Sequence, residues 1–213
     1  METNWAAEHL QVIRTLMERS AVYRRALAPT MALTGVIGMV AAMVGWAAQV
    51  NAPRSFAIYW LVVGLVAVAG AFALVRRQAL REGEPFWSPP TRRVAQALLP
   101  ALSAGSILSV IMLLEIGSRG PNGVTEADLA RLPAMWIILY GCALHAAGFF
   151  MPRGMKMFGW AFVLGGCALF GLGVPDIVPV NLYVHGIMGL FFGALHLAYG
   201  IYLYFTEQRK QAV

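Results

Sequence analysis

Six apolar runs, each about long enough to cross a lipid bilayer, constrain this chain more than any other feature of its sequence. A transmembrane helix needs about 20 mostly apolar residues to cross a hydrocarbon core about 30 Å thick. The runs lie near 30–50, 56–75, 94–116, 132–151, 158–175 and 181–205. Backbone groups in lipid must be hydrogen-bonded internally, so the runs predict helices. The sequence therefore predicts an all-α polytopic membrane protein with six transmembrane helices in one bundle.

The composition agrees with a membrane domain. Of the 213 residues, 59% are hydrophobic and 12% are charged. The charged share is about half of that in a typical soluble domain. At this length we expect one transmembrane domain over 29–205, a cytoplasmic lead-in over 1–28 and a short cytoplasmic tail over 206–213.

The basic residues alternate with the spans and predict the orientation of the chain. With the N-terminus inside, 13 of the 16 Lys and Arg residues fall in inner segments, and only Arg54, Arg119 and Arg131 fall in outer loops. An excess of Lys and Arg marks the cytoplasmic side of a membrane protein. We therefore expect both termini in the cytoplasm. The net charge of +6 then reflects topology, and no nucleic-acid partner is expected.

Four aromatic residues lie near the ends of predicted spans. Tyr59, Trp60 and Trp136 are close to outer ends, and Trp160 is close to an inner end. Trp and Tyr are enriched where helices meet the lipid headgroups. We expect these four side chains to form parts of two interfacial belts.

The lead-in over 1–28 has the pattern of an amphipathic helix. Its apolar side is formed by Leu10, Ile13, Met17 and Ala21, which recur at helical spacing. A basic amphipathic helix beside a span is expected to lie on the inner leaflet, with anionic lipid as its partner. The alternative is a solvated helix that packs on the inner loops.

The inner segment 76–93 is the most polar part of the chain. Pro85, Pro89 and Pro90 interrupt any continuous helix through it. One interpretation is a loop that sets topology, with Phe86 and Trp87 at the headgroups. The other is a docking site for a cytoplasmic protein partner, because aromatic and arginine side chains dominate protein interfaces.

Two histidines in the sixth span are the strongest functional lead. His185 and His196 lie eleven residues apart, which is about 16 Å along a helix and about 20° from exact superposition. Gly189, Phe192 and Tyr199 share their face of the helix. Ionisable side chains at this depth should face the bundle interior.

Depth along the spans predicts two polar layers. Glu115, at the outer end of the third span, is at the level of His185. His145 in the fourth span is at the level of His196, and Cys142 lies one turn before it. Both layers require that the third, fourth and sixth spans touch.

Three interpretations of these residues remain open. A proton or small-solute path would use all four ionisable groups, since such groups often mark transport paths. The pair His145 and His196 could instead ligate a haem b iron or a metal ion. Thirdly, neutral histidines could bridge helices by hydrogen bonds of about 1 kcal/mol each. The expectation we favour is a protein without a cofactor and without a metal site.

Glycines are frequent in the last two spans. Gly186, Gly189 and Gly193 lie in the sixth span, and Gly165 and Gly166 lie in the fifth. Small residues let helix backbones approach closely, so we expect the two spans to pack on each other. Glycines beside histidines could also make room for a flat cofactor.

Sequence motifs of enzymes are absent. The chain contains no G-x-S-x-G, no H-E-x-x-H and no P-loop. The serines at 103, 106 and 109 are expected to form helix–helix hydrogen bonds. Cys142 and Cys167 lie in separate apolar segments and predict no disulfide framework. We expect a non-enzymatic protein.

The run IRTLMERSAVYRRALAP, followed by a span and later by FFGALHLAYGIYLYF, resembles a loose group of uncharacterised bacterial multi-span membrane proteins. The resemblance implies a bacterial inner-membrane location and brings no activity with it. The expected function is that of a non-enzymatic membrane or partner-interaction protein. A small-solute or proton transporter is the first alternative, and bis-histidine haem or metal binding is the second.

Overall fold

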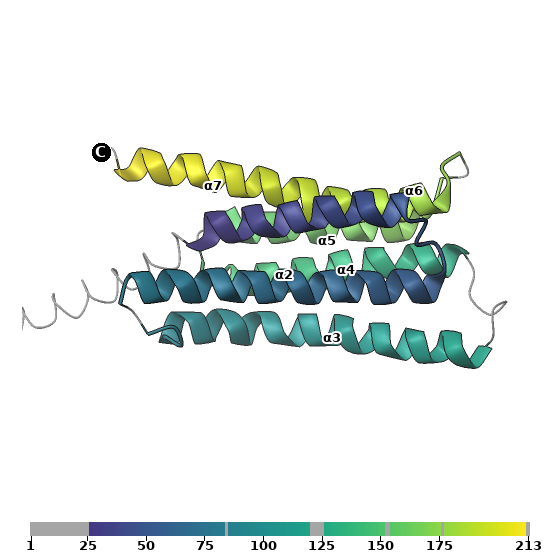
Figure 1. Cartoon of the computed structure of the whole chain (residues 1–213), viewed down its shortest axis with the longest axis horizontal. Coiled ribbons are helices and arrows are strands. Elements are labelled where there is room, and N and C mark those ends of the chain that lie inside the picture. Colours follow the sequence, from purple (N-terminus) through teal and green to yellow (C-terminus); the bar gives the residue numbers. More distant parts are fainter. Residues whose placement is uncertain (1–25, 84, 120–125, 152–153, 176, 212–213) are drawn as a thin grey trace, which may run out of the picture.

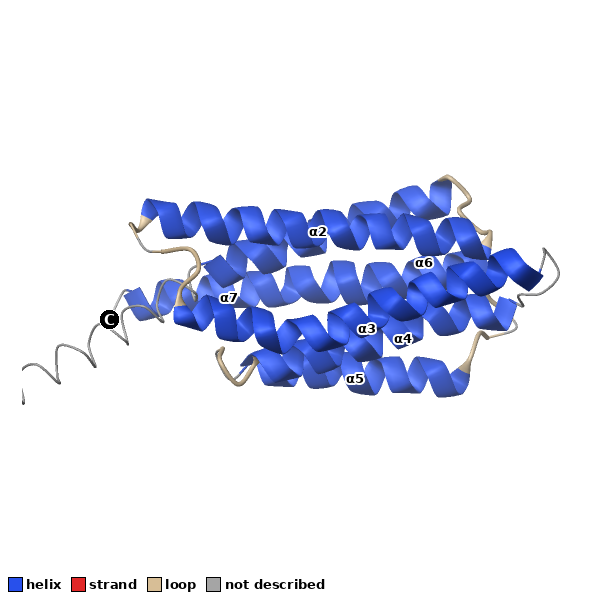
Figure 2. Cartoon of the chain, turned by 90° about the horizontal axis from the view of Figure 1, so that it is seen from below, coloured by secondary structure: helices blue, strands red, loops and turns tan. Residues whose placement is uncertain are grey.

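The computed structural model describes residues 26–83, 85–119, 126–151, 154–175 and 177–211, and all regular structure in these residues is helical (Figure 2). The lead-in predicted for 1–28 therefore lies almost wholly outside the described residues. The helices run antiparallel along one axis (Figure 1). Their bounds are Ala26–Ala47, α2 Pro53–Arg81, α3 Pro89–Arg119, α4 Glu126–Ala147, α5 Gly154–Leu172, α6 Val180–Met188 and α7 His196–Gln211.

The last helix is continuous and changes its winding in the middle. Between α6 and α7 lies η1, a π-helical segment over Gly189–Leu195. The predicted tail over 206–213 begins inside this helix, because α7 continues to Gln211. Each predicted apolar run corresponds to one helix, with α6, η1 and α7 counted as one. Every helix begins before its run, whereas Ala26–Ala47, α4 and α5 end three or four residues before the run does.

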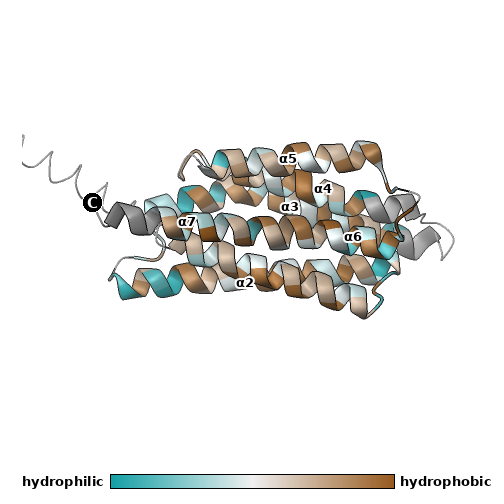
Figure 3. Cartoon of the chain, turned by 90° about the horizontal axis from the view of Figure 1, so that it is seen from above, coloured by the Kyte–Doolittle hydropathy of each residue, from teal (hydrophilic) through white to brown (hydrophobic). Residues whose placement is uncertain are grey.

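Five described helices are long and apolar enough to cross a membrane, so the chain is a multi-span membrane protein by helix length and hydropathy. They are Ala26–Ala47, Pro53–Arg81, Pro89–Glu115, Gly154–Leu172 and Val180–Thr206. The remaining predicted span, 132–151, corresponds to α4, whose side chains are described only from Arg131 onward. Apolar residues occur along the whole length of the helices, and hydrophilic residues are concentrated toward the helix ends (Figure 3).

Proline and glycine explain where several helices begin and end. Pro53 occupies the first turn of α2, where its missing N–H group breaks no hydrogen bond. Gly83 after α2 and Gly173 after α5 have φ angles of 67° and 69°. This left-handed conformation ends a helix and suits glycine.

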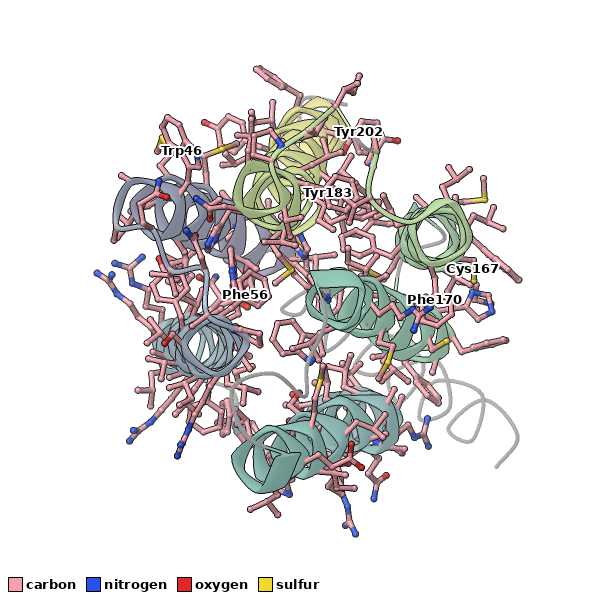
Figure 4. The ribbon with its side chains drawn as sticks, turned by 90° about the vertical axis from the view of Figure 1, so that its right-hand side faces the viewer. Trp46, Phe56, Cys167, Phe170, Tyr183 and Tyr202 are labelled. Atoms are coloured by element: carbon pink, nitrogen blue, oxygen red, sulfur yellow. The ribbon has the colours of Figure 1, made fainter. Side chains whose placement is uncertain are left out.

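Helix α4 occupies the centre of the bundle (Figure 4). It packs on α3, α5 and α6, and α3 packs also on α2. Helix Ala26–Ala47 lies against the last helix and against α2, where the Tyr59 hydroxyl donates a hydrogen bond of 2.6 Å to the Ala41 carbonyl. Of the contacts that the two predicted layers require, those of α4 with α3 and with α6 are present, but α4 lies between α3 and α6 (Figure 4).

The interior contains two apolar clusters at different levels. The first includes Ile137, Leu144, Met155, Phe158 and Phe162, which come from α4 and α5. The second includes Phe56, Ala57 and Trp60 from α2 together with Leu132, Val184 and Met188. In Figure 4, Phe56 lies between α2 and the centre of the bundle.

A seam of small residues joins helix Ala26–Ala47 to the last helix along most of its length. A Cβ atom at Gly193 would lie 2.9 Å from the Met39 nitrogen, and one at Gly200 would lie 2.8 Å from the Ala32 nitrogen. A Cβ atom at Gly38 would overlap the Phe192 carbonyl. The two backbones touch because no side chain separates them.

This seam corrects the expected partner of the sixth-span glycines. Gly189 and Gly193 face the first helix, where Ala42 and Met39 lie, rather than α5. Of the two fifth-span glycines, Gly165 faces Phe191 as predicted, with 2.5 Å from its ideal Cβ position to the ring, whereas Gly166 faces Ile138 of α4.

Gly186 departs further from the expectation. It is exposed, and a Cβ atom there would meet no atom within 4 Å. Its backbone therefore makes no close helix contact among the described residues.

Candidate functional site

His196 is fully buried in the first apolar cluster and bonds through both ring nitrogens. Its Nε2 atom lies 2.8 Å from the Tyr140 hydroxyl oxygen, and its Nδ1 atom lies 2.9 Å from the Phe191 carbonyl oxygen. The rings of Phe158, Phe162 and Phe192 surround the imidazole at centroid distances of 5.2, 5.3 and 6.1 Å. The histidine thus ties the last helix to α4.

The partners of His196 fix its tautomer. The Phe191 carbonyl can only accept a hydrogen bond, so Nδ1 carries the proton. In the neutral imidazole Nε2 is then unprotonated and accepts the Tyr140 O–H bond. Both polar atoms of the ring are satisfied without water or ligand.

The π-helical segment η1 brings the Phe191 carbonyl to His196. The hydrogen-bond ladder of a π-helix joins residues five apart instead of four. Phe191 and His196 have this separation. The Phe191 carbonyl bonds to the imidazole Nδ1 of His196, whereas the backbone N–H of His196 donates to the Gly193 carbonyl. The sequence indicates nothing of this change in winding, since Gly189–Leu195 continues the same apolar pattern.

His185 is buried in the second cluster, also with both nitrogens bonded. Its Nε2–H donates to the Val50 carbonyl at 3.2 Å, and its Nδ1 accepts from the Trp60 indole N–H at 3.3 Å. The ring lies where a side chain on Gly45 would overlap it. His185 thus joins α6 to α2 and to the turn after the first helix.

The two histidines adopt opposite tautomers in different clusters. His185 carries its proton on Nε2, whereas His196 carries its proton on Nδ1, as their carbonyl partners require. Each imidazole is about 99% or more buried, with exposed fractions of 1% and 0%. Both are neutral hydrogen-bond bridges between helices in this geometry.

The two residues of each predicted layer do not contact each other in the structure. Glu115 is exposed on α3, while both ring nitrogens of His185 bond to Val50 and Trp60. His145 contacts Trp160 of α5 at a centroid distance of 5.5 Å.

The two histidines of the predicted lower layer reach different sides of α5. His145 contacts Trp160, whereas His196 contacts Phe158 and Phe162. Because each helical residue turns by about 100°, position 160 points away from 158 and 162 by about 160°. Equal depth therefore does not bring the two imidazoles into one coordination sphere.

Cys142 is exposed on α4, and Cys167 is exposed on α5. Both are free thiols. Cys142 therefore does not extend a polar layer into the bundle. Groups of three or more His, Cys, Asp or Glu side chains able to hold a metal are absent from the described residues.

Two buried polar atoms near the predicted lower layer have no partner among the described residues. They are Nδ1 of His145 and the hydroxyl oxygen of Tyr199. The Tyr199 ring stacks on Phe158 at 4.5 Å, and its hydroxyl lies over Gly154, 2.9 Å from an ideal Cβ position there. A third such atom, Oδ1 of Asn181, lies at the other end of the bundle.

Three of the four expected interfacial aromatics donate hydrogen bonds to other helices, and one of them, Trp60, is buried rather than interfacial. Trp60 is buried and bonds to His185, and Tyr59 bonds to the first helix. Trp136 donates to the Ser109 hydroxyl at 2.7 Å. Tyr59 and Trp136 are partly buried, and Trp160 is half exposed. A polar tip on a large apolar ring serves either role, so sequence position alone did not separate them.

The serine prediction holds at one of three positions. Ser109 is buried and accepts the Trp136 bond that joins α3 to α4. Ser103 and Ser106 are exposed and donate to carbonyls of their own helix.

An open groove of about 1260 Å³ lies at the end of the bundle that carries the α5–α6 loop. Trp46, Gln49, Asn51 and Arg131 line it together with residues between Leu169 and Leu182. Neither Glu115 nor His185 belongs to its lining, so this groove does not open onto the predicted upper layer.

Sequence reasoning missed the residues that complete the histidine sites. Tyr140 and Trp60 carry the side-chain donors, and Val50 and Phe191 supply carbonyls. Tyr140 lies in the same apolar run as His145 but five residues before it, so predicted depth did not point to Tyr140 as the partner of His196. Carbonyl partners leave no trace in a sequence.

No family model, curated protein or solved structure matches this chain.

Proposed function

We propose that this chain is a non-enzymatic protein of a bacterial inner membrane that acts through its cytoplasmic loops and termini on another protein or on the bilayer. The observation that carries the proposal is the saturation of His185 and His196. All four ring nitrogens bond to groups of the bundle itself. Because these nitrogens are occupied by hydrogen bonds within the bundle, we place the interaction with a partner at the ends of the helices.

The distribution of charge supports the proposed orientation. The α2–α3 loop, the α4–α5 loop and the end of α7 lie at one end of the bundle (Figure 1). Arg76, Arg77, Arg81, Arg92, Arg93, Lys156, Arg209 and Lys210 belong to this end. The opposite end has Arg54, Arg119 and Arg131. The positive-inside rule assigns the first end to the cytoplasm.

The proposal is tested on detergent-purified protein and on the same protein in liposomes. We expect no Soret band in the oxidised or dithionite-reduced spectrum and no stoichiometric metal. We also expect liposomes with the protein to hold a pH gradient as long as liposomes with the His185→Phe variant. A Soret band or metal that disappears in His196→Ala, or a proton leak that disappears in His185→Phe, would reject the proposal.

A small-solute or proton carrier is the second candidate function. Nδ1 of His145 and the hydroxyl of Tyr199, which have no partner in the described part of the chain, favour it, because unsatisfied buried polar atoms are costly and often mark a bound solute or water. A path through them would have to reach Tyr140 and His196, whose atoms are already bonded to each other. A proton leak that disappears in His145→Phe would favour this function.

Haem or metal binding is the third candidate. Nδ1 of His145, which no described residue bonds, could serve as a ligand. His196 would have to give up its bond to Tyr140 or to Phe191 before a metal could take its place. The absorption spectrum and metal analysis above decide this candidate directly.

A further inference from the structure

The tip of the α2–α3 hairpin carries an unusual concentration of exposed positive charge. Arg76, Arg77 and Arg81 are exposed on the last turns of α2. Arg92 and Arg93 are exposed on the first turns of α3. Between residues 76 and 93 the sequence has five arginines against two glutamates.

The arginines of the two helices stand at the same depth. On α2 the charged residues Arg54 and Arg76 are 22 positions apart, with no charged residue between them, which is about 33 Å along a helix. On α3 the same separation and the same absence of charge lie between Arg93 and Glu115. A length of about 33 Å matches the hydrocarbon core, about 30 Å thick.

This match places the guanidinium groups at the level of lipid phosphates. Arg76 and Arg77 on α2, and Arg92 and Arg93 on α3, form two adjacent pairs on neighbouring helices. The C-terminal end of α2 is hydrophilic in Figure 3. Arginine binds phosphate oxygens through paired N–H donors.

The loop between the helices also fits the membrane interface. Phe86 packs on Phe72 of α2 with a centroid distance of 4.7 Å, which holds the loop against the helix. Trp87 next to it is 59% exposed. Exposed Trp beside arginine at the end of a span is typical of the headgroup region.

We infer that the α2–α3 tip binds a phospholipid with two phosphate groups, of the cardiolipin class. Each arginine pair takes one phosphate, and Trp87 lies among the headgroups beside it. Basic surfaces between membrane helices recognise such lipids by charge and by the spacing of their phosphates. The inference deepens the proposed function, since it names the bilayer component that the inner hairpin contacts.

The test is a lipid titration followed by native mass spectrometry of the intact protein in detergent. Tetraoleoyl cardiolipin is compared with dioleoyl phosphatidylglycerol at equal phosphate concentration. We expect Arg77→Gln/Arg93→Gln to weaken cardiolipin binding by about 25-fold, at about fivefold for each charge removed. The matched control Arg54→Gln removes an exposed arginine at the other end and should leave binding unchanged.

Three results would overturn the inference. The first is equal loss of cardiolipin in Arg54→Gln and in the double variant. The second is equal affinity of the wild type for the two lipids, which would leave charge alone without two-phosphate recognition. The third is unchanged binding in the double variant, which would leave the tip open to an acidic protein instead.

Single variants and the choice of readout make the lipid-binding test independent of folding defects and of the proposed function. If the double variant does not fold, the single variants Arg77→Gln and Arg93→Gln should each lose about fivefold. Because the readout is lipid affinity, its failure leaves the absorption spectrum and the proton-leak result of the proposed function unaffected.

Discussion

The hydroxyl of Tyr140 on α4 lies 2.8 Å from Nε2 of His196 on the last helix, and this bond closes a polar unit inside an apolar cluster. Nδ1 of the same imidazole bonds to Phe191. A buried imidazole with both nitrogens satisfied joins two helices at no cost in unpaired polar groups. The unit explains how a histidine can be stable in the centre of a membrane bundle.

Removing the Tyr140 hydroxyl should therefore destabilise the bundle. Tyr140→Phe leaves the buried Nε2 of His196 without a donor, and we expect a loss of about 1–2 kcal/mol in the free energy of unfolding. Thermal unfolding in detergent measures it. Tyr204→Phe, which changes a 55% exposed tyrosine of the same helix bundle, is the control. Equal losses in both variants would contradict the bridge.

The three histidines of the bundle should differ in their importance for stability. His185→Ala and His196→Ala each remove two hydrogen bonds and a buried ring, so we expect losses of about 2–4 kcal/mol. His145→Ala should cost less, because its ring is only partly buried and its Nδ1 has no partner among the described residues. Urea unfolding in mild detergent ranks the three variants. A loss in His145→Ala as large as the others would contradict this ranking.

The seam between the first and last helices should not tolerate a methyl group. In Gly193→Ala the new Cβ would lie 2.9 Å from the Met39 nitrogen, and such overpacking costs about 1–3 kcal/mol. Gly64→Ala on α2 is the matched control, since a Cβ atom there would meet no described atom within 4 Å. There alanine should stabilise the helix by about 0.5–1 kcal/mol. Changes of the same sign in both variants would argue against the seam.

The helices could be predicted from the sequence because each depends on the hydropathy of one continuous stretch of about 20 residues. The contacts between helices could not, because several helices have a small-residue face and any two such faces can pack. Gly189 and Gly193 illustrate this: their spacing predicts close packing, but only the fold shows that Ala42 and Met39 face them. The same limit explains why Trp60 was placed at the headgroups when it is buried beside His185.

The histidine site shows a second limit of sequence reasoning. The polarity of His196 correctly predicted an inward-facing side chain, which is fully buried, but its predicted partner rested on depth, and depth fixes only one coordinate of a side chain. The direction around the helix axis places His145 and His196 on different sides of α5. The π-helical winding of Gly189–Leu195 and the carbonyl partners depend on tertiary packing, which no spacing pattern encodes.

The proposed orientation predicts which end of the bundle an impermeant reagent can reach. Ile177, in the α5–α6 loop, is 92% exposed, and Trp87, in the α2–α3 loop, is 59% exposed. In a Cys142→Ser/Cys167→Ser background, we expect a membrane-impermeant maleimide to label Ile177→Cys in intact bacterial cells. Trp87→Cys should react only after permeabilisation. The reverse pattern would place the basic end outside.

The central claim is that the buried histidines are hydrogen-bond bridges rather than ligands or proton carriers. The most direct test is the ¹⁵N NMR spectrum of histidine-labelled protein at neutral pH, with His196 assigned by its absence in His196→Phe. We expect a neutral ring with a protonated Nδ1 and an unprotonated Nε2 whose resonance shifts in Tyr140→Phe. A doubly protonated ring, a protonated Nε2 or a metal-bound nitrogen at His196 would contradict it.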